Sequence, residues 1–248
     1  MSRTLPAPIL LTVAILKAVT VAFVRVAVIY HCEQTTGRLD EELHRVGAET
    51  VRFHLHRGDP VPGAESFDRV VTLGGEMGAY EDDRHAWMAA EKTWLAGLVE
   101  KDVPVLGICL GSQLLAAALG GSAFRAERPE ANVIDLELTA DGDADPVMKT
   151  LGSRVFSLHQ DTFDHPPGSM LLAYSELYPQ AFRAGSALAV QFHPDADSDL
   201  AKRWGKEDWS VLGQAGIDYD DYSSRLEEAD PALDANSRAF FRAWLERG

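Results

Sequence analysis

The sequence is short of cysteine and of basic residues, and each shortage excludes a class of protein. Its 248 residues contain two cysteines, Cys32 and Cys109, which are too few for a disulfide framework and match no metal-ligand spacing. Lys and Arg together number 23 against 38 Asp and Glu, which leaves a net charge of −15. This charge argues against a nucleic-acid groove or an anionic membrane surface as the main binding partner. We expect a protein of the reducing cytoplasm that needs no metal or other cofactor.

Internal repeats, low-complexity tracts and a glycine-rich phosphate loop with its lysine are also missing from the sequence. Without that loop, the sequence shows no ATP-dependent synthetase module. Hydrophobic residues at 46% and charged residues at 25% are ordinary proportions for a globular protein. A chain of this length buries one substantial core, so we predict one domain with a C-terminal appendage.

One long apolar run, residues 8–24, is interrupted only by Lys17 and two threonines. Three interpretations stay open for it: an extra segment outside the core, an added helix, or a targeting signal. No convincing small-x-small cleavage site follows, and the apolar pattern continues directly into a predicted strand. We therefore treat residues 1–23 as an N-terminal extension and expect no membrane association.

From residue 24 to residue 121, predicted strands and helices alternate. Runs rich in β-branched residues predict strands, and the 3.6-residue apolar period predicts helices. The expected strands are 24–30, 49–54, 67–73 and 103–107, and the expected helices are 38–46, 85–100 and 114–119. This alternation predicts βαβ units and therefore an α/β fold with a mostly parallel sheet and helices on both faces. In such sheets the ligand binds outside the carboxyl ends of the strands.

After residue 121 the pattern changes to short, turn-bounded segments. We expect small antiparallel additions at 132–139, 154–158, 169–174 and 180–183, followed by a buried strand at 187–193 that Pro194 ends. From residue 198 the chain is helical in character. The expected organisation is one domain over residues 24–197 and a helical appendage over residues 198–248. The expected packing residues of the appendage are Trp204, Trp209, Phe240, Phe241 and Trp244, and its expected breaks are Gly213, Gly216 and Asp230-Pro231.

A cysteine occupies the turn between the 103–107 strand and the helix that follows. Gly107-Ile-Cys109-Leu-Gly111 places it where the pattern Gly-x-Ser-x-Gly places the serine of a nucleophile elbow. Glycines suit a tight turn at which strand and helix approach closely. The positive end of a helix favours the thiolate, so Cys109 is a candidate nucleophile. The alternative is a small buried hydrophobic side chain.

A cysteine nucleophile needs a base and an orienting group. His193 ends a predicted strand, and the carboxylate of Asp195 two residues later can reach back to the imidazole. An oxyanion also needs backbone N–H donors, which Leu110 after the elbow and Gly75 at the end of a neighbouring strand can supply. The Gly74-Gly75 pair is otherwise an ordinary turn. We interpret the remaining histidines outside residues 157–161 as surface or satisfied core residues: His31, His44, His54, His56, His85 and His165.

Three sequence motifs together indicate a family. These are Gly-Ile-Cys-Leu-Gly-Ser-Gln at 107–113, Leu-Gly-Gly at 73–75 and Gln-Phe-His-Pro-Asp at 191–195. The chain resembles the class I (triad) glutamine amidotransferases, and most closely their free-standing GMP synthase-like group. The resemblance covers residues 24–195, and the helical tail is similar as well.

The resemblance implies a flavodoxin-like α/β fold that hydrolyses glutamine to glutamate and ammonia through a γ-glutamyl thioester. It also implies a role for each matching residue. Cys109 matches the nucleophile, His193 the base, Asp195 the triad acid, Gly75 and Leu110 the oxyanion donors, Gln113 a glutamine-binding position, and His159 and Gln160 the substrate loop. That loop, residues 157–161, has a plain polar turn as its alternative interpretation.

Three residues depart from the family pattern. Asp195 stands where glutamate is usual, so its carboxylate is one methylene shorter. Glu76 replaces a common proline and adds negative charge near the site. Gln160 replaces a common glycine, which puts the family's backbone contact there in doubt.

The predicted function is that of a thiol amidohydrolase, a class I glutamine amidotransferase whose ammonia passes to a separate synthetase or acceptor subunit, unless the protein acts alone. Two alternatives stay open. One is a γ-glutamyl hydrolase or peptidase with the same Cys-His-acid triad. The other is a degenerate, non-catalytic binding subunit, which the three departures motivate.

Overall fold

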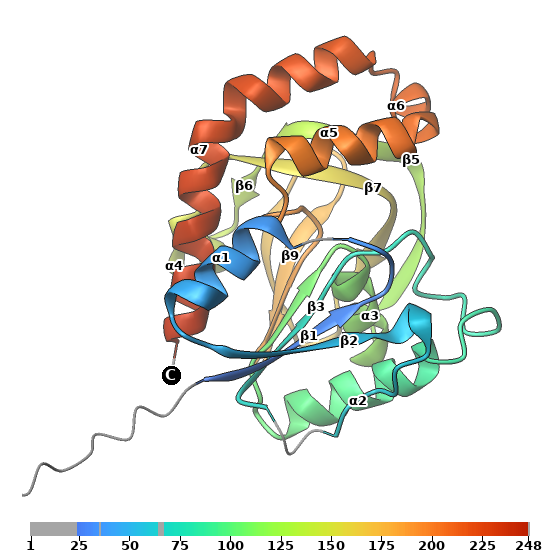
Figure 1. The fold of residues 1–248 in the computed structure, drawn as a ribbon, viewed down its shortest axis with the longest axis vertical. Helices are drawn as coiled ribbons and strands as arrows, with labels where there is room; N and C mark the ends of the chain where they lie inside the picture. The colour runs from blue at the N-terminus through green and yellow to red at the C-terminus, as the bar shows by residue number, and fades with distance from the viewer. Residues whose placement is uncertain (1–23, 35, 64–66, 248) are drawn as a thin grey trace, which may run out of the picture.

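A computed structural model describes residues 24–34, 36–63 and 67–247 (Figure 1). An eight-stranded sheet lies at its centre, in the order β2-β1-β3-β4-β10-β9-β8-β6. Its strands are β1 (Arg25–Tyr30), β2 (Glu49–His54), β3 (Arg69–Thr72), β4 (Val105–Ile108), β6 (Glu137–Leu138), β8 (Met170–Tyr174), β9 (Pro179–Ala184) and β10 (Ala187–Val190). A second sheet pairs β5 (Ser122–Asp135) with β7 (Arg154–Asp164). The predicted N-terminal extension lies outside the described residues.

The central sheet is parallel over β2, β1, β3, β4 and β10, and antiparallel from β10 through β9 and β8 to β6. The predicted flavodoxin-like fold, a mostly parallel sheet with antiparallel additions, is confirmed. Because β4 lies between β3 and β10 and all three strands are parallel, the segments that follow them meet at the carboxyl end of the sheet. Gly74, Cys109 and His193 lie on those segments.

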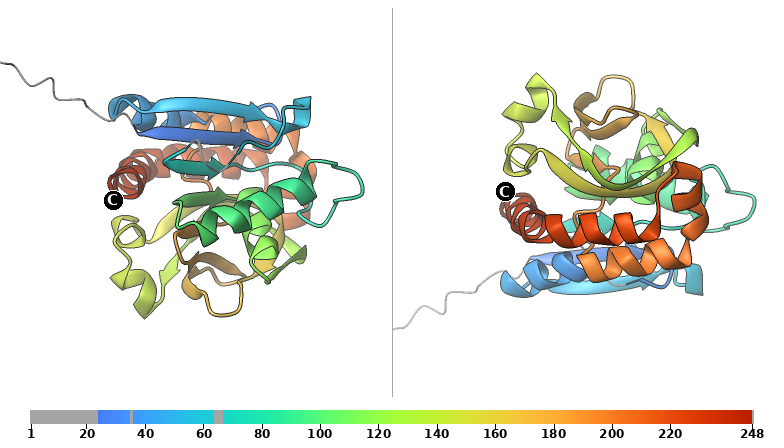
Figure 2. Two further views of the ribbon diagram at one scale, coloured as in Figure 1. Left: turned by 90° about the horizontal axis from the view of Figure 1, so that it is seen from below. Right: turned by 90° about the horizontal axis from the view of Figure 1, so that it is seen from above.

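Helices pack against both sheets, and some of them cover the two faces of the central sheet. They are α1 (Gly37–Arg45), α2 (Met88–Glu100), α3 (Leu110–Ala118), α4 (Ala140–Ala144), α5 (Ser198–Glu207), α6 (Trp209–Ala215) and α7 (Tyr219–Glu246), with 3-10 turns η1 (Leu55–Arg57) and η3 (Met148–Thr150). Side chains alternate along β1, so Val26 and Val28 pack with α1 and α7, whereas Ala27 and Ile29 pack with α2 and α3. Figure 2 shows α5 and α7 on one side of the molecule and α2 on the opposite side.

The C-terminal helices take part in the packing of the sheets. Phe240, Phe241 and Trp244 of α7 are buried in the same cluster as the β1 residues Val26 and Val28. A third cluster joins β5 and β7 to α5, α6 and α7. The predicted packing roles of the α7 aromatic residues are confirmed, whereas the domain boundary at residue 197 stays a prediction.

Two predictions about the helices and one about a strand were wrong. The helix after Cys109 begins at Leu110 instead of residue 114, because the elbow leads directly into its first turn. Pro231 lies inside α7 instead of ending a helix. Figure 1 shows that α7 bends along its length, and a proline, which lacks the N–H and crowds the preceding turn, accounts for such a bend. The strand predicted at 187–193 ends at Val190, so the motif histidine follows the strand.

The segments predicted at 132–139 and 154–158 belong to longer strands. β5 starts at Ser122 and β7 continues to Asp164, because the two pair antiparallel with a register shift between Arg125 and Glu130. Within the described ranges, no helix combines the length and the apolar character that crossing a membrane requires.

Candidate active site

Cys109 lies at the turn between β4 and α3, in a backbone conformation that few non-glycine residues adopt. Its φ is 51° and its ψ is −109°, and its N–H donates to the carbonyl of Val190 over 2.9 Å. A Cβ added to Gly111 would lie 2.1 Å from the carbonyl oxygen of Thr72, and one added to Gly107 would lie 2.6 Å from that of Gly111. Glycine is therefore required on both sides of the turn, as the elbow pattern predicts.

His193 and Asp195 follow β10 and lie beside the elbow. The imidazole Nδ1 of His193 lies 3.2 Å from Asp195 Oδ1, and both side chains are buried. The shorter aspartate thus reaches the ring despite its missing methylene. The backbone holds both residues, because His193 N–H donates to the Phe156 carbonyl over 2.8 Å and the Asp195 carbonyl accepts from the N–H of Arg38 over 3.2 Å. With Nδ1 directed at the carboxylate, Nε2 is the nitrogen left for the thiol.

Gly74, on the loop after β3, lies close to the side chains of His193 and Cys109. A Cβ added to Gly74 would lie 3.0 Å from His193 Cε1, 3.9 Å from His193 Nε2 and 3.5 Å from Cys109 Cβ. A side chain at position 74 would therefore meet the imidazole and the cysteine together, a requirement for glycine that no local sequence pattern indicates. The segment that carries the predicted nucleophile, the segment that carries both the base and the acid, and the loop after β3 meet at this point.

Charge at the site favours a protonated imidazole. Burial lowers the pKa of His193, but the negative charges of a Cys109 thiolate and of Asp195, together with their hydrogen bonds, outweigh burial and raise this pKa to about 10. A second cysteine, Cys32, also lies near the site. Burial, with the charges of Glu76 and Cys109, raises the pKa of the Cys32 thiol to about 12. Cys32 therefore stays a thiol at neutral pH.

The two predicted oxyanion donors lie on either side of Cys109. Leu110 is the first residue of α3, so its N–H has no acceptor within the helix. Gly75 lines the cavity described below, and among the described residues its N–H donates to no backbone acceptor. The side chain of Leu110 is buried away from the cavity, with Cδ2 2.7 Å from the position of a Cβ on Gly75. The backbone N–H of Leu110 is therefore the group of this residue that can donate a hydrogen bond to an oxyanion.

The three predicted substrate-binding residues also line the cavity, but protein groups hold all of them. The Gln113 amide donates to the Asp161 carbonyl over 3.1 Å and to Gln191 over 3.2 Å. His159 uses both ring nitrogens, with Nδ1 2.8 Å from the Asp161 carbonyl and Nε2 3.2 Å from Glu130. Gln160 accepts a hydrogen bond from Arg125. Neither ring nitrogen of His159 is therefore free for a ligand.

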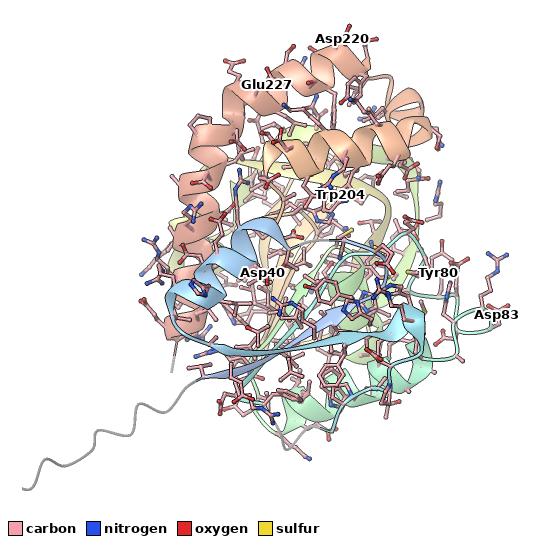
Figure 3. The ribbon with its side chains drawn as sticks, viewed as in Figure 1. Asp40, Tyr80, Asp83, Trp204, Asp220 and Glu227 are labelled. Carbon is pink, nitrogen blue, oxygen red and sulfur yellow. The ribbon has the colours of Figure 1, made fainter. Side chains whose placement is uncertain are left out.

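A cavity of about 420 Å³ opens over Cys109 and His193. Its walls come from the loops after β1 and β3, from β5 and β7, and from α5 and α6. Trp204 of α5 packs against His193 with the ring centroids 4.8 Å apart. In Figure 3, Trp204 lies below α5 and Tyr80 lies on the loop after β3; both line the cavity.

Sequence reasoning treated Trp204 as a packing residue, and no local pattern could have placed it over the imidazole. In the described part of the chain, no group of three or more His, Cys, Asp and Glu side chains is arranged to hold a metal ion.

Comparisons with known proteins find related chains over most of this sequence. The family model "Glutamine amidotransferase class-I" matches residues 27–204. A glutamine-hydrolyzing GMP synthase subunit of Saccharolobus solfataricus is 30% identical over 177 residues, which cover 69% of this chain and 89% of that protein. A glutamine amidotransferase-like protein of Gibberella zeae is 28% identical over 178 residues, 69% of this chain and 72% of that protein. The crystal structure of a glutamine amidotransferase from Thermotoga maritima is similar with a TM-score of 0.80 at 30% identity, over 90% of this chain and 98% of that one.

Proposed function

The chain belongs to the class I glutamine amidotransferase family, and on that premise we propose that it hydrolyses glutamine to glutamate and ammonia through a γ-glutamyl thioester on Cys109. The observation that carries the proposal is the meeting of a strained elbow cysteine with a buried His193–Asp195 pair beneath one cavity. A buried cysteine that served only as packing would need neither the unusual backbone conformation nor the charged partners.

In the first half of the reaction, the thiolate of Cys109 attacks the side-chain amide carbon of glutamine. The carbonyl oxygen becomes an oxyanion, to which the N–H groups of Gly75 and Leu110 donate. The C–N bond then breaks, and the imidazolium of His193 donates its proton to the departing nitrogen, which leaves as ammonia. A pKa of about 10 keeps that proton on the ring at neutral pH.

In the second half, neutral His193 takes a proton from a water molecule that attacks the thioester carbon. The C–S bond breaks, glutamate leaves, and Cys109 and His193 return to the ion pair. Asp195 holds Nδ1 throughout, so that Nε2 keeps facing the sulfur.

The cavity wall supplies charges of both signs, as a zwitterionic amino acid requires. Arg125 lines it beside acidic residues that include Glu76, Glu81 and Asp208. We propose that the guanidinium binds the α-carboxylate and that the acidic side binds the α-ammonium group of glutamine.

Glutamate release from glutamine tests the proposal. Cys109→Ala should abolish the activity, whereas Cys32→Ala should retain it, because Cys32 lines the same cavity but its raised pKa keeps it a thiol. A diazo-ketone analogue of glutamine should label wild type once, at Cys109. Equal rates in wild type and Cys109→Ala would refute the enzyme, and an absence of labelling would support a non-catalytic binding protein.

The size of the cavity also supports a second candidate, a γ-glutamyl hydrolase or peptidase. About 420 Å³ lies within the range of roughly 300–1,000 Å³ that accommodates drug-sized ligands, which exceed glutamine in size. A panel of γ-glutamyl amides with increasingly large leaving groups separates the two candidates. A peptidase would process the larger members faster than glutamine.

The proposal for the ammonia acceptor rests on the names of the relatives. Because several relatives are named as single subunits of a glutamine-hydrolyzing GMP synthase, we propose that a separate protein chain receives the ammonia. Glutamate release in the presence of cell extract should then exceed release by the purified chain, and equal release would indicate that the chain acts alone.

A further inference from the structure

A buried histidine lies directly behind the Gly74–Gly75 peptide and has no part in the reaction steps above. His31 follows β1, and its side chain is completely buried. Its ring stacks on Trp87, with the centroids 5.0 Å apart and the planes at 22°. Such a group requires partners for both ring nitrogens, because unpaired polar atoms are costly in the interior.

Both nitrogens of His31 have partners that only accept hydrogen bonds. Nδ1 lies 3.0 Å from the Leu73 carbonyl and 3.3 Å from the Gly74 carbonyl. Nε2 lies 3.1 and 2.9 Å from the two carboxylate oxygens of Glu91 on α2. Nδ1 must therefore carry a hydrogen, because a carbonyl cannot donate one. Thr72 Oγ1 donates to the same carboxylate over 2.7 Å and anchors it to the end of β3.

The charge of Glu91 reinforces this arrangement. Burial lowers the pKa of His31, but the Glu91 carboxylate and the hydrogen bonds to the two carbonyls raise it overall. This direction favours a ring that donates from both nitrogens, which matches the accepting partners on both sides.

The hydrogen bond to the Gly74 carbonyl fixes the orientation of the next N–H. In a trans peptide the C=O of one residue and the N–H of the following residue point in opposite directions, and the described chain contains no cis peptide. With the Gly74 carbonyl turned towards His31, the Gly75 N–H points to the other side, where Gly75 lines the cavity beside Cys109. Gln34 Nε2 donates to the same carbonyl over 3.3 Å.

Two consecutive glycines need such a restraint. Glycine reaches backbone conformations closed to other residues, so the Gly74–Gly75 peptide is unusually free to rotate. A rotated peptide would point its carbonyl oxygen at the developing oxyanion and replace attraction by repulsion.

We propose that His31, held by Glu91, positions the Gly74–Gly75 peptide so that the Gly75 N–H donates to the oxyanion. His31 is a positioning residue that acts through Gly75 and does not touch the substrate. The inference rests on the proposed glutaminase reaction.

Two neutral replacements separate this role from simple filling of the core. The amide nitrogen of asparagine reaches the place of Nδ1, facing the Gly74 carbonyl, whereas that of glutamine reaches the place of Nε2, facing residue 91. His31→Asn and His31→Gln are each combined with Glu91→Gln, so that no carboxylate is left buried without its partner. If His31 positions the Gly74–Gly75 peptide, the double variant with asparagine should have a kcat within about threefold of the Glu91→Gln parent. The double variant with glutamine should have a kcat about 10- to 100-fold below that parent, approaching the loss of an oxyanion donor.

The readouts distinguish positioning from damage to the fold. The KM for glutamine and the alkylation rate of Cys109 by iodoacetamide should stay unchanged in both variants, because neither requires the oxyanion donor. Equal kcat values for the Asn and Gln variants, or kcat values that follow the melting temperatures, would overturn the inference. If neither double variant folds, Gln34→Ala tests the same carbonyl: kcat should fall about threefold at constant alkylation rate, and an unchanged kcat would count against the inference. A wild type without glutaminase activity would instead refute the proposed function.

Discussion

Gly74→Ala is the substitution whose effect on the site can be worked out most directly from the structure. The added methyl carbon would lie 3.0 Å from His193 Cε1 and 3.5 Å from Cys109 Cβ. Ordinary van der Waals contact begins near 3.4 Å, so the imidazole must retreat by about 0.4 Å, whereas the cysteine can stay in place. Gly74 is not among the described glycines with positive φ, so alanine adds no backbone strain there.

A displacement of that size has a definite kinetic cost. A misplacement of about 1 Å at a reacting group can reduce the rate about 100-fold, so about 0.4 Å should reduce kcat/KM roughly five- to tenfold. That factor corresponds to about 1 kcal/mol of transition-state stabilisation. The alkylation rate of Cys109 should fall as well, because the imidazolium moves away from the thiolate that it stabilises.

The assay compares glutamate release and iodoacetamide alkylation in wild type, Gly74→Ala and Gly97→Ala. Gly97 lies inside α2, and a Cβ there would meet no heavy atom within 4 Å. Alanine at that position should stabilise the helix by about 0.5–1 kcal/mol and leave activity unchanged. A folded Gly74→Ala protein with wild-type kcat/KM would refute the reasoning. An equal loss in Gly97→Ala would show that the effect is not local to the site.

Three further predictions concern pH, the C-terminal helices and stability. Burial lowers the pKa of His193 but the charges of Cys109 and Asp195 raise it to about 10, so kcat/KM should be level near neutral pH and fall as pH rises through about 10. Asp195→Asn removes one of those charges and should move the fall to lower pH; an unchanged profile would contradict the pairing. Trp204→Ala should lower kcat about tenfold, because the imidazole loses its ring contact at 4.8 Å, while Trp204→Phe should retain most of the activity; identical kinetics in the two variants would refute this role. Glu42 is buried and accepts from Arg45 and Arg242, joining α1 to α7. In urea unfolding, Glu42→Ala should therefore cost about 2 kcal/mol, whereas the exposed Glu246→Ala should cost less than about 0.5 kcal/mol; similar losses in both would show that burial is not what matters.

The strand-and-helix alternation and the elbow could be predicted because they are local. β-Branched runs, helical periodicity and two glycines around Cys109 act over a few residues, and no distant contact is needed to identify them. The order His-Pro-Asp after an apolar strand likewise marked His193 and Asp195. The roles of these residues in catalysis stay predictions, although the structure brings their side chains together.

Contacts between distant segments could not be predicted, because they depend on which faces the elements bury. Pro231 normally ends a helix, yet packing of Leu226 and Leu233 on either side of it keeps α7 continuous and bent. Only the tertiary structure places Trp204 over His193, since α5 must first pack across the β5–β7 sheet.

The clearest case is the pairing of His31 with Glu91. Local patterns assigned His31 no role beyond that of a surface or satisfied core histidine, because the two residues lie 60 positions apart on different elements. The structure buries both behind the Gly74–Gly75 turn. The sequence by itself determined which residues are candidates for the reaction, since residue type and local backbone pattern follow from neighbouring positions. Tertiary structure decided which groups orient them, since orientation depends on contacts between segments that the chain order does not relate.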